Sequence, residues 1–159
     1  MQVDPPSRPN RIPWPPIVLV AAVAAAVLVH FRLFLPPIPF AETLALRAVG
    51  WVLIAAGLGL GVWARETFKH LNTTILPHRG ATALATTGPF RFSRNPIYLG
   101  EVLALIGIGL VLNALPFLLI VPVFMFAVDR LAIRREERHL LDRFGDAWVD
   151  YADSVRRWL

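Results

Sequence analysis

One short segment holds the residue types that could bind and position an anionic group. Asn95 and Pro96 suit the start of a helix, because Asn caps free backbone N–H groups and Pro fits the first helical position. A helix start also carries the positive end of the helix dipole, so Arg94 beside it would complete a site for a carboxylate or a phosphate. Tyr98 would add an aromatic face one turn later. A plainer interpretation, in which the segment only opens a membrane helix, stays open.

A second candidate group is the pair of carboxylates Glu136 and Glu137, within a stretch of helical periodicity over 129–150. At about 100° per residue, Glu137 lies near the middle of the apolar face and Glu136 at its edge. The apolar face comprises Ile133, Leu140, Leu141, Phe144, Trp148 and Tyr151. A carboxylate there must be paired or bound, because an unpaired buried charge is costly. It could pair with an arginine or bind a ligand, and the pattern leaves both possibilities open.

Other ionisable residues give weaker signals. Glu101 lies one turn inside an apolar stretch, where ionisable side chains are often functional, although it could also reach the membrane surface or pair with Arg94. The sequence contains no cysteine, which excludes disulfides and thiolate metal sites. Its histidines have no metal-ligand spacing. We therefore expect no metal site.

The elements that would position these residues are membrane helices. The chain has 159 residues and is 56% hydrophobic, which is more apolar character than a soluble domain of this size can bury. We expect an all-α integral membrane protein with about four transmembrane helices and a C-terminal amphipathic helix. The expected spans are 17–35, 44–63, 97–112 and 115–128. Only Asn113 and Ala114 separate the last two, which predicts a tight helical hairpin.

Composition and charge predict the organisation of the chain. A mobile Pro-rich arm over 1–16 is followed by two N-terminal spans over 17–63 and by residues 64–159, which hold both candidate groups and would be the catalytic core of an enzyme. Basic residues concentrate before the first span, between the second and third, and after the fourth. Cytoplasmic segments carry such an excess, so both termini and the long central loop are expected in the cytoplasm. The net charge of +5 has this explanation, and we expect no nucleic-acid partner.

Gly57, Gly59 and Gly61 form a Gly-x-Gly pattern inside the second apolar stretch. Such a pattern cradles a pyrophosphate only between a strand and a helix, and the chain shows no alternation of strands and helices. The glycines therefore predict close packing of helices. A soluble enzyme of the Rossmann type is therefore excluded.

Taken together, the two candidate groups resemble the isoprenylcysteine carboxyl methyltransferase family and the related phospholipid methyltransferases. The resemblance is carried by Arg94-Asn95-Pro96-Ile97-Tyr98-Leu99-Gly100, by Glu136-Glu137-Arg138-His139-Leu140, and by Phe144-Gly145 and Tyr151. It covers roughly residues 73–159. Asn95 stands where the family commonly has His, and Phe90 where it commonly has Tyr. Asn does not titrate near neutral pH, so any role of that His as a base is absent here.

The resemblance implies an enzyme that methylates a lipophilic acceptor from the bilayer with S-adenosylmethionine as cofactor. The catalytic residues it implies are Arg94, Asn95, Tyr98 and Glu137. The cofactor contacts it implies are Thr82, Leu84, Ala85, Phe90, Asn95, Pro96, Ile97, Tyr98 and Glu136. The acceptor could be an isoprenylcysteine carboxylate, a phospholipid amine or a small thiol, and the sequence does not select among them.

Two other classes of function stay open. A membrane reductase that uses NADPH would share a related C-terminal architecture, although sterol reductases are usually larger. A small transporter or membrane scaffold is the non-enzymatic alternative. Transporters tend to carry an ionisable residue in mid-span, whereas Glu101 and Arg47 lie near span ends.

Overall fold

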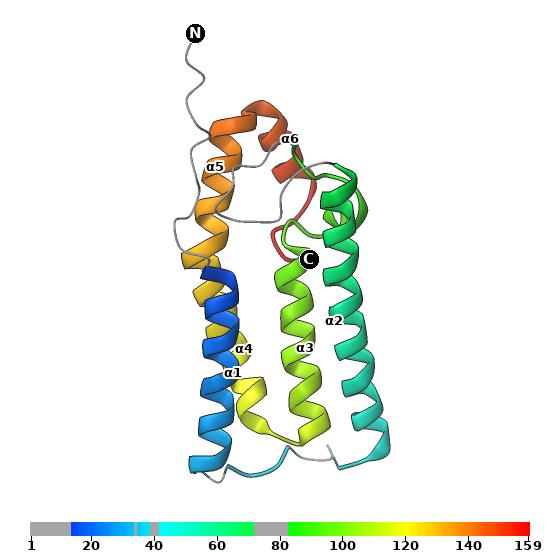
Figure 1. Ribbon diagram of the computed structural model, residues 1–159, viewed down its shortest axis with the longest axis vertical. Helices are drawn as coiled ribbons and strands as arrows, with labels where there is room; N and C mark the ends of the chain where they lie inside the picture. The colour runs from blue at the N-terminus through cyan, green and yellow to red at the C-terminus, as the bar shows by residue number, and fades with distance from the viewer. Residues whose placement is uncertain (1–13, 34, 39–41, 72–82) are drawn as a thin grey trace.

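The computed structural model describes residues 14–33, 35–38, 42–71 and 83–159, and within these ranges all regular structure is helical. The long helices run side by side along the long axis of the molecule (Figure 1). They are α1 (Trp14–Leu33), α2 (Leu44–His70), α3 (Pro96–Leu112) and α4 (Leu115–Val128). A 3-10 turn, η1 (Gly88–Arg91), precedes α3, and η2 (Asp129–Ile133), α5 (Arg134–Phe144) and α6 (Asp146–Ser154) follow α4. The prediction of an all-α protein is confirmed for these residues.

Three helices in the described part of the chain are long and apolar enough to cross a membrane. They are Trp14–Leu33, Leu44–His70 and the continuous run Leu115–Phe144. The apolar helix α3 is shorter, at 17 residues. Large apolar side chains, Val20 and Trp51 among them, remain exposed along α1 and α2. Contiguous apolar surface of this kind is expected to lie against lipid.

The helices α2 and α3 pack with their backbones in contact where both have glycine. A Cβ atom added to Gly57 would collide with the carbonyl oxygen of Gly100. One added to Gly107 would lie 2.5 Å from the carbonyl oxygen of Gly50. Only residues without a side chain permit such an approach. These two contacts fix how α2 and α3 are aligned along their length.

We expect Gly57→Ala to destabilise the protein by about 1–3 kcal/mol, because the backbone of α3 must move to admit the new methyl group. Gly59→Ala is the matched control, since nothing lies within 4 Å of a Cβ built on Gly59 or on Gly61. This control should be neutral or slightly stabilising, because Ala favours helix more than Gly does. The melting temperatures of the two variants in one detergent test this difference in stability, and equal values would contradict the packing described.

The contacts also decide the prediction made from the three glycines. The predicted close packing holds for Gly57 but not for Gly59 or Gly61.

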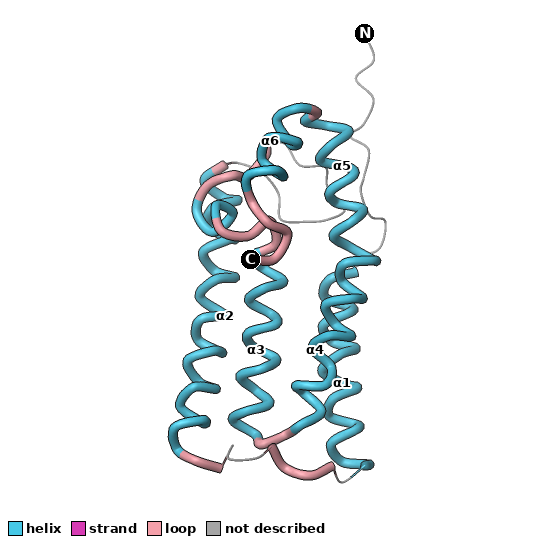
Figure 2. Tube along the Cα trace, turned by 180° about the vertical axis from the view of Figure 1, so that it is seen from behind, coloured by secondary structure: helices cyan, strands magenta, loops and turns pink. Residues whose placement is uncertain are grey.

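The C-terminal stretch differs from the single helix expected over 129–150. Its first part continues directly from α4 through the π-helical segment η2, so α4, η2 and α5 form one run. Gly145 ends α5 with a φ of 53°, a conformation open to glycine. The chain then turns into α6, which lies beyond the start of α3 in both views (Figures 1 and 2). Glycine therefore divides the expected amphipathic helix into α5 and α6.

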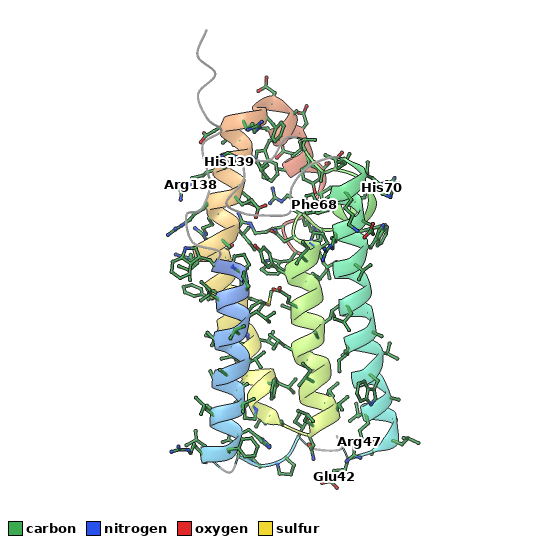
Figure 3. All side chains as sticks on the ribbon, viewed as in Figure 1. Glu42, Arg47, Phe68, His70, Arg138 and His139 are labelled. Atoms are coloured by element: carbon green, nitrogen blue, oxygen red, sulfur yellow. The ribbon has the colours of Figure 1, made fainter. Side chains whose placement is uncertain are left out.

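Many charged and polar side chains lie at the end of the bundle where α3 begins (Figure 3). Figure 3 shows His70, Arg138 and His139 at this end, and Glu42 and Arg47 at the other. At the far end Asn113 adopts the left-handed conformation with a φ of 51°, and its side chain accepts a hydrogen bond of 2.8 Å from the backbone of Ile38. The tight turn predicted between α3 and α4 is confirmed.

Candidate active site

The start of α3 is held by the backbone of the C-terminal segment. The Arg94 N–H donates to the carbonyl oxygen of Arg156 at 3.0 Å. The side-chain amide of Asn95 donates to the carbonyl oxygen of Arg157, also at 3.0 Å. The buried Ser93 hydroxyl donates to that same oxygen at 3.3 Å and accepts from the Asn95 N–H at 3.1 Å. Asn95 is the N-cap residue by position, as predicted, but its side chain binds the C-terminal segment and makes no capping bond.

Glu137 lies at the centre of an arginine network. Its carboxylate oxygens accept from the Arg157 guanidinium at 3.0 and 2.5 Å, and Arg94 lies at 3.6 Å. Asp129, in the π-helical segment, pairs with Arg157 at 3.1 Å and with Arg134 at 2.7 Å. The hydrogen bond to Glu137 raises the pKa of Arg157, so the guanidinium stays charged. Of the two possibilities left open for Glu137, the structure forms the pair with arginine.

Arg94 has one donor that no described residue satisfies. Its guanidinium lies 5.7 Å from the centre of the Trp148 ring, and Nη1 donates to the carbonyl oxygen of Ala152 at 3.4 Å. Its Nε is buried without a hydrogen-bond partner among the residues described. A buried donor left unpaired is costly, so this N–H is available to a ligand. A nearby hollow of about 510 Å³ is lined by Arg134, Glu137, Arg138, Leu141 and Trp148.

Most of the apolar residues expected to contact the cofactor gather beside α6. Those within one hydrophobic cluster are Leu84, Ala85, Phe90 and Ile97. The buried Trp148 and Tyr151 of α6 and the buried Ala64 of α2 belong to the same cluster. The Tyr151 hydroxyl donates to the carbonyl oxygen of Phe90 at 2.8 Å, and burial raises the pKa of Tyr151 to about 12, so the hydroxyl keeps its proton at neutral pH. Thr82 lies outside the described residues.

Tyr98 and Glu136 form a separate part of the site. Tyr98 is buried in the core formed by α1, α3 and α4, apart from the cluster beside α6. Its hydroxyl lies within electrostatic range of Glu136 and Glu101. Among the described residues Glu136 has no hydrogen bond or ion pair. The two adjacent carboxylates therefore differ, because Glu137 is engaged by arginine and Glu136 is free for a ligand.

Three members of the site were missed at the sequence level, namely Ser93, Asp129 and Arg157. The need to pair a carboxylate on an apolar face pointed to an arginine without indicating which one. By its position in the sequence, Asp129 indicates only the start of a helix. The sequence also allows Arg94 to pair with Glu101, but the structure pairs Arg94 with Glu137.

Residues 45–147 match the family described as phospholipid methyltransferase. The chain is similar to the nickel-cobalt-cadmium resistance protein NccN of Alcaligenes xylosoxydans xylosoxydans, at 34% identity over 100 residues, which are 63% of this chain and 46% of NccN. It is also similar to an uncharacterized protein of Haemophilus influenzae, at 38% identity over 64 residues, which are 40% of this chain and 100% of that protein. The chain thus spans about half the length of NccN, and no solved structure matches it.

Proposed function

Because the chain belongs to the phospholipid methyltransferase family, we propose that it is a membrane enzyme that transfers a methyl group from S-adenosylmethionine to a lipophilic acceptor. The acceptor would be an isoprenylcysteine-carboxylate-like molecule or a lipid. One observation carries the cofactor assignment beyond family membership. The first turn of α3 is flanked by a cation, Arg94, and by a carboxylate, Glu136; among the described residues one donor of Arg94 is unsatisfied and Glu136 has no partner.

These residues fit the amino-acid end of the cofactor, which has a carboxylate and an ammonium group. The Arg94 Nε would donate to the carboxylate, and Glu136 would accept from the ammonium. The aromatic face of Tyr98 suits a sulfonium cation, and Phe90, which lies in the cluster beside α6, would join the apolar contacts. Leu84, Ala85, Pro96 and Ile97 would supply apolar contacts around the rest of the molecule, as the family resemblance implies.

The bound cofactor supplies a methyl group on sulfonium, which is open to in-line displacement without a covalent intermediate. The protein then has to align the acceptor with that methyl group, and alignment alone can lower a barrier by several kcal/mol. Asn95 is assigned a positioning role, because its amide holds the C-terminal segment on α3 through the Arg157 carbonyl. Glu137 has the same kind of role through the Arg157 side chain.

The proposed membrane arrangement has four spans, with α3 as the short third span and α5 and α6 as the amphipathic C-terminal part. Both termini and the site would lie on the cytoplasmic side. Support comes from the basic residues, which concentrate at the end of the bundle that holds α5, α6 and the end of α2. The cofactor would enter from the cytoplasm and the acceptor from the bilayer.

Ligand binding separates this function from its alternatives. We expect S-adenosylhomocysteine to raise the melting temperature of the detergent-solubilised protein, because selective binding at 100 times Kd adds about 2.7 kcal/mol of stability. NADPH at the same concentration should leave it unchanged. A shift with NADPH alone would favour a reductase instead. If neither ligand gave a shift, a transporter or scaffold would become the better interpretation.

A further inference from the structure

A second hollow lies among α1, α2 and α3, in the apolar part of the bundle. It has a volume of about 460 Å³ and is lined mainly by aliphatic side chains and glycines. Its lining includes two charged residues, Arg65 and Glu101, and one residue assigned to the cofactor, Ile97. We call this hollow the α1–α3 groove. It joins the cofactor side of the proposed site to a surface expected to face lipid.

Glu101 has an unsatisfied oxygen in this groove. Its Oε2 is buried and has no hydrogen-bond partner among the described residues. Arg94, the cation nearest to it in the sequence, is engaged by Glu137. A carboxylate oxygen without a donor is costly inside a membrane helix. Its presence is explained if a molecule bound in the groove supplies the missing donor.

The contacts between glycines show how deep Glu101 lies. Gly57 faces Gly100 and Gly50 faces Gly107, so α2 and α3 run antiparallel in a fixed register. By this register Arg65 is level with the residues just before α3, whereas Glu101 is level with Ala56. Nine residues separate these two levels, which is roughly 13 Å at the rise of an α-helix. The exposed Arg65 therefore lies at the rim of the groove, and Glu101 lies well inside it.

We propose that the α1–α3 groove holds the methyl acceptor, and that Glu101 selects an acceptor whose reacting atom carries a proton. This inference rests on the proposed function. The acceptor is an apolar chain that ends in an amine, a thiol or a hydroxyl, because such a group donates the hydrogen bond that Glu101 lacks. A carboxylate acceptor would bring a second anion against Glu101, and the cation in the lining of the groove, Arg65, is attached to the backbone at a level roughly 13 Å away along the helices, at the rim.

The same carboxylate gives the transferred proton a destination. As the lone pair of the reacting atom forms its bond to the methyl carbon, Glu101 takes the proton from that atom. The bond between carbon and sulfur breaks, and its electron pair stays on sulfur, which becomes a neutral thioether. Glu101 ends as a carboxylic acid and returns the proton to water. A carboxylate acceptor has no proton to release, so it would leave Glu101 without a role.

Binding of matched ligands tests the selection. The full chain, saturated with S-adenosylhomocysteine in detergent, is titrated with one alkyl chain ended in turn by an amine, a thiol, a hydroxyl or a carboxylate. We expect at least one proton-bearing ligand to bind on the order of tenfold more tightly than the carboxylate, a difference of about 1.4 kcal/mol. Glu101→Gln, which keeps the shape of the side chain, should abolish that preference. Glu66→Gln is the control, because Glu66 is paired with Lys69 on the surface of α2. Equal binding in the wild type, or a preference that survives Glu101→Gln, overturns the proposal.

Methyl transfer provides the second test. The protein is incubated with membrane lipids and methyl-labelled S-adenosylmethionine, and the product is treated with mild alkali, which releases methanol from methyl esters but not from amines, thioethers or ethers. We expect alkali-stable label, with a rate about 10²–10⁴-fold lower in Glu101→Gln and partly restored at high pH, where the acceptor loses its proton without help. Label released as methanol overturns the proposal. If the wild type neither bound S-adenosylhomocysteine nor transferred label, the proposed function would fail, and the alkyl series, repeated without S-adenosylhomocysteine, would still report on the groove.

Discussion

Replacing Glu137 by glutamine should lower the free energy of unfolding by about 2–3 kcal/mol, somewhat less than breaking a fully buried ion pair costs. The Glu137 carboxylate binds the Arg157 guanidinium through both oxygens and lies 3.6 Å from Arg94. Glutamine would leave Arg94 without an anionic partner, at a side-chain exposure of 15%. Arg157 keeps Asp129 as a second partner and is 34% exposed, which is why we expect the lower figure. The measurement is chemical or thermal unfolding in one detergent.

Glu66→Gln again supplies the matched control. It removes one carboxylate from an ion pair whose side chains are 57% and 46% exposed, and solvent screens such a pair so that it contributes little to stability. A Glu137→Gln variant as stable as this control would show that the arginine network does not hold the C-terminal segment. In Glu137→Gln, cofactor affinity should fall only as a consequence of the lost structure.

Replacing Glu136 by glutamine should lower the affinity for the cofactor without lowering the free energy of unfolding. Glu136 has no partner among the described residues, so loss of its charge strands no cation and removes an unpaired carboxylate from a partly buried position, and the free energy of unfolding should stay the same or rise. A charge-assisted hydrogen bond to the cofactor ammonium is worth about 1.5–3 kcal/mol. The affinity for S-adenosylhomocysteine should therefore fall by about 10–100-fold, measured as a dissociation constant by calorimetry.

The pair of variants also shows how this assignment could be wrong. If Glu137→Gln melts like the wild type but no longer binds, the roles of the two carboxylates are reversed. If neither variant changes binding, the cofactor does not reach α5, and the proposal then depends on Arg94 and the start of α3 alone.

The helices were predictable because their signals are local. Apolar runs between polar segments predicted α1 to α4, and the short polar break at Asn113 predicted the turn between α3 and α4. The continuity of α4 with α5 was not predictable in the same way. A π-helical turn has almost the same composition as an α-helical one, and Asp129 resembles a helix start until its pairing with Arg134 and Arg157 is seen.

The site was predictable only where its residues are neighbours in the sequence. The sequence around the start of α3 indicates both a helix start and side chains that can bind a ligand, namely Arg94, Asn95 and Tyr98. The helical wheel placed Glu136 and Glu137 on different parts of the apolar face. The partners come from much farther along the chain. Arg157 is 20 residues from Glu137 and 62 from Asn95 in sequence, yet it binds both. No periodicity connects such positions, so only the folded chain reveals that the C-terminal segment completes the start of α3.

The π-helical segment η2 gives the chain one place inside a helix where its length can change. A π turn holds one residue more than an α turn, so removing one residue from 130–133 would let α4 and α5 join as an unbroken α-helix. The residue removed is the extra one that the π turn holds, so Glu137 would still face Arg94 and Arg157. Removing a second residue would have no π turn to absorb it, and every later side chain would rotate by about 100°. Arg138 would then point where Glu137 now lies, and a third arginine would face Arg94 and Arg157. The first deletion would keep the attractive cluster of charges, and the second would turn it into a repulsive one.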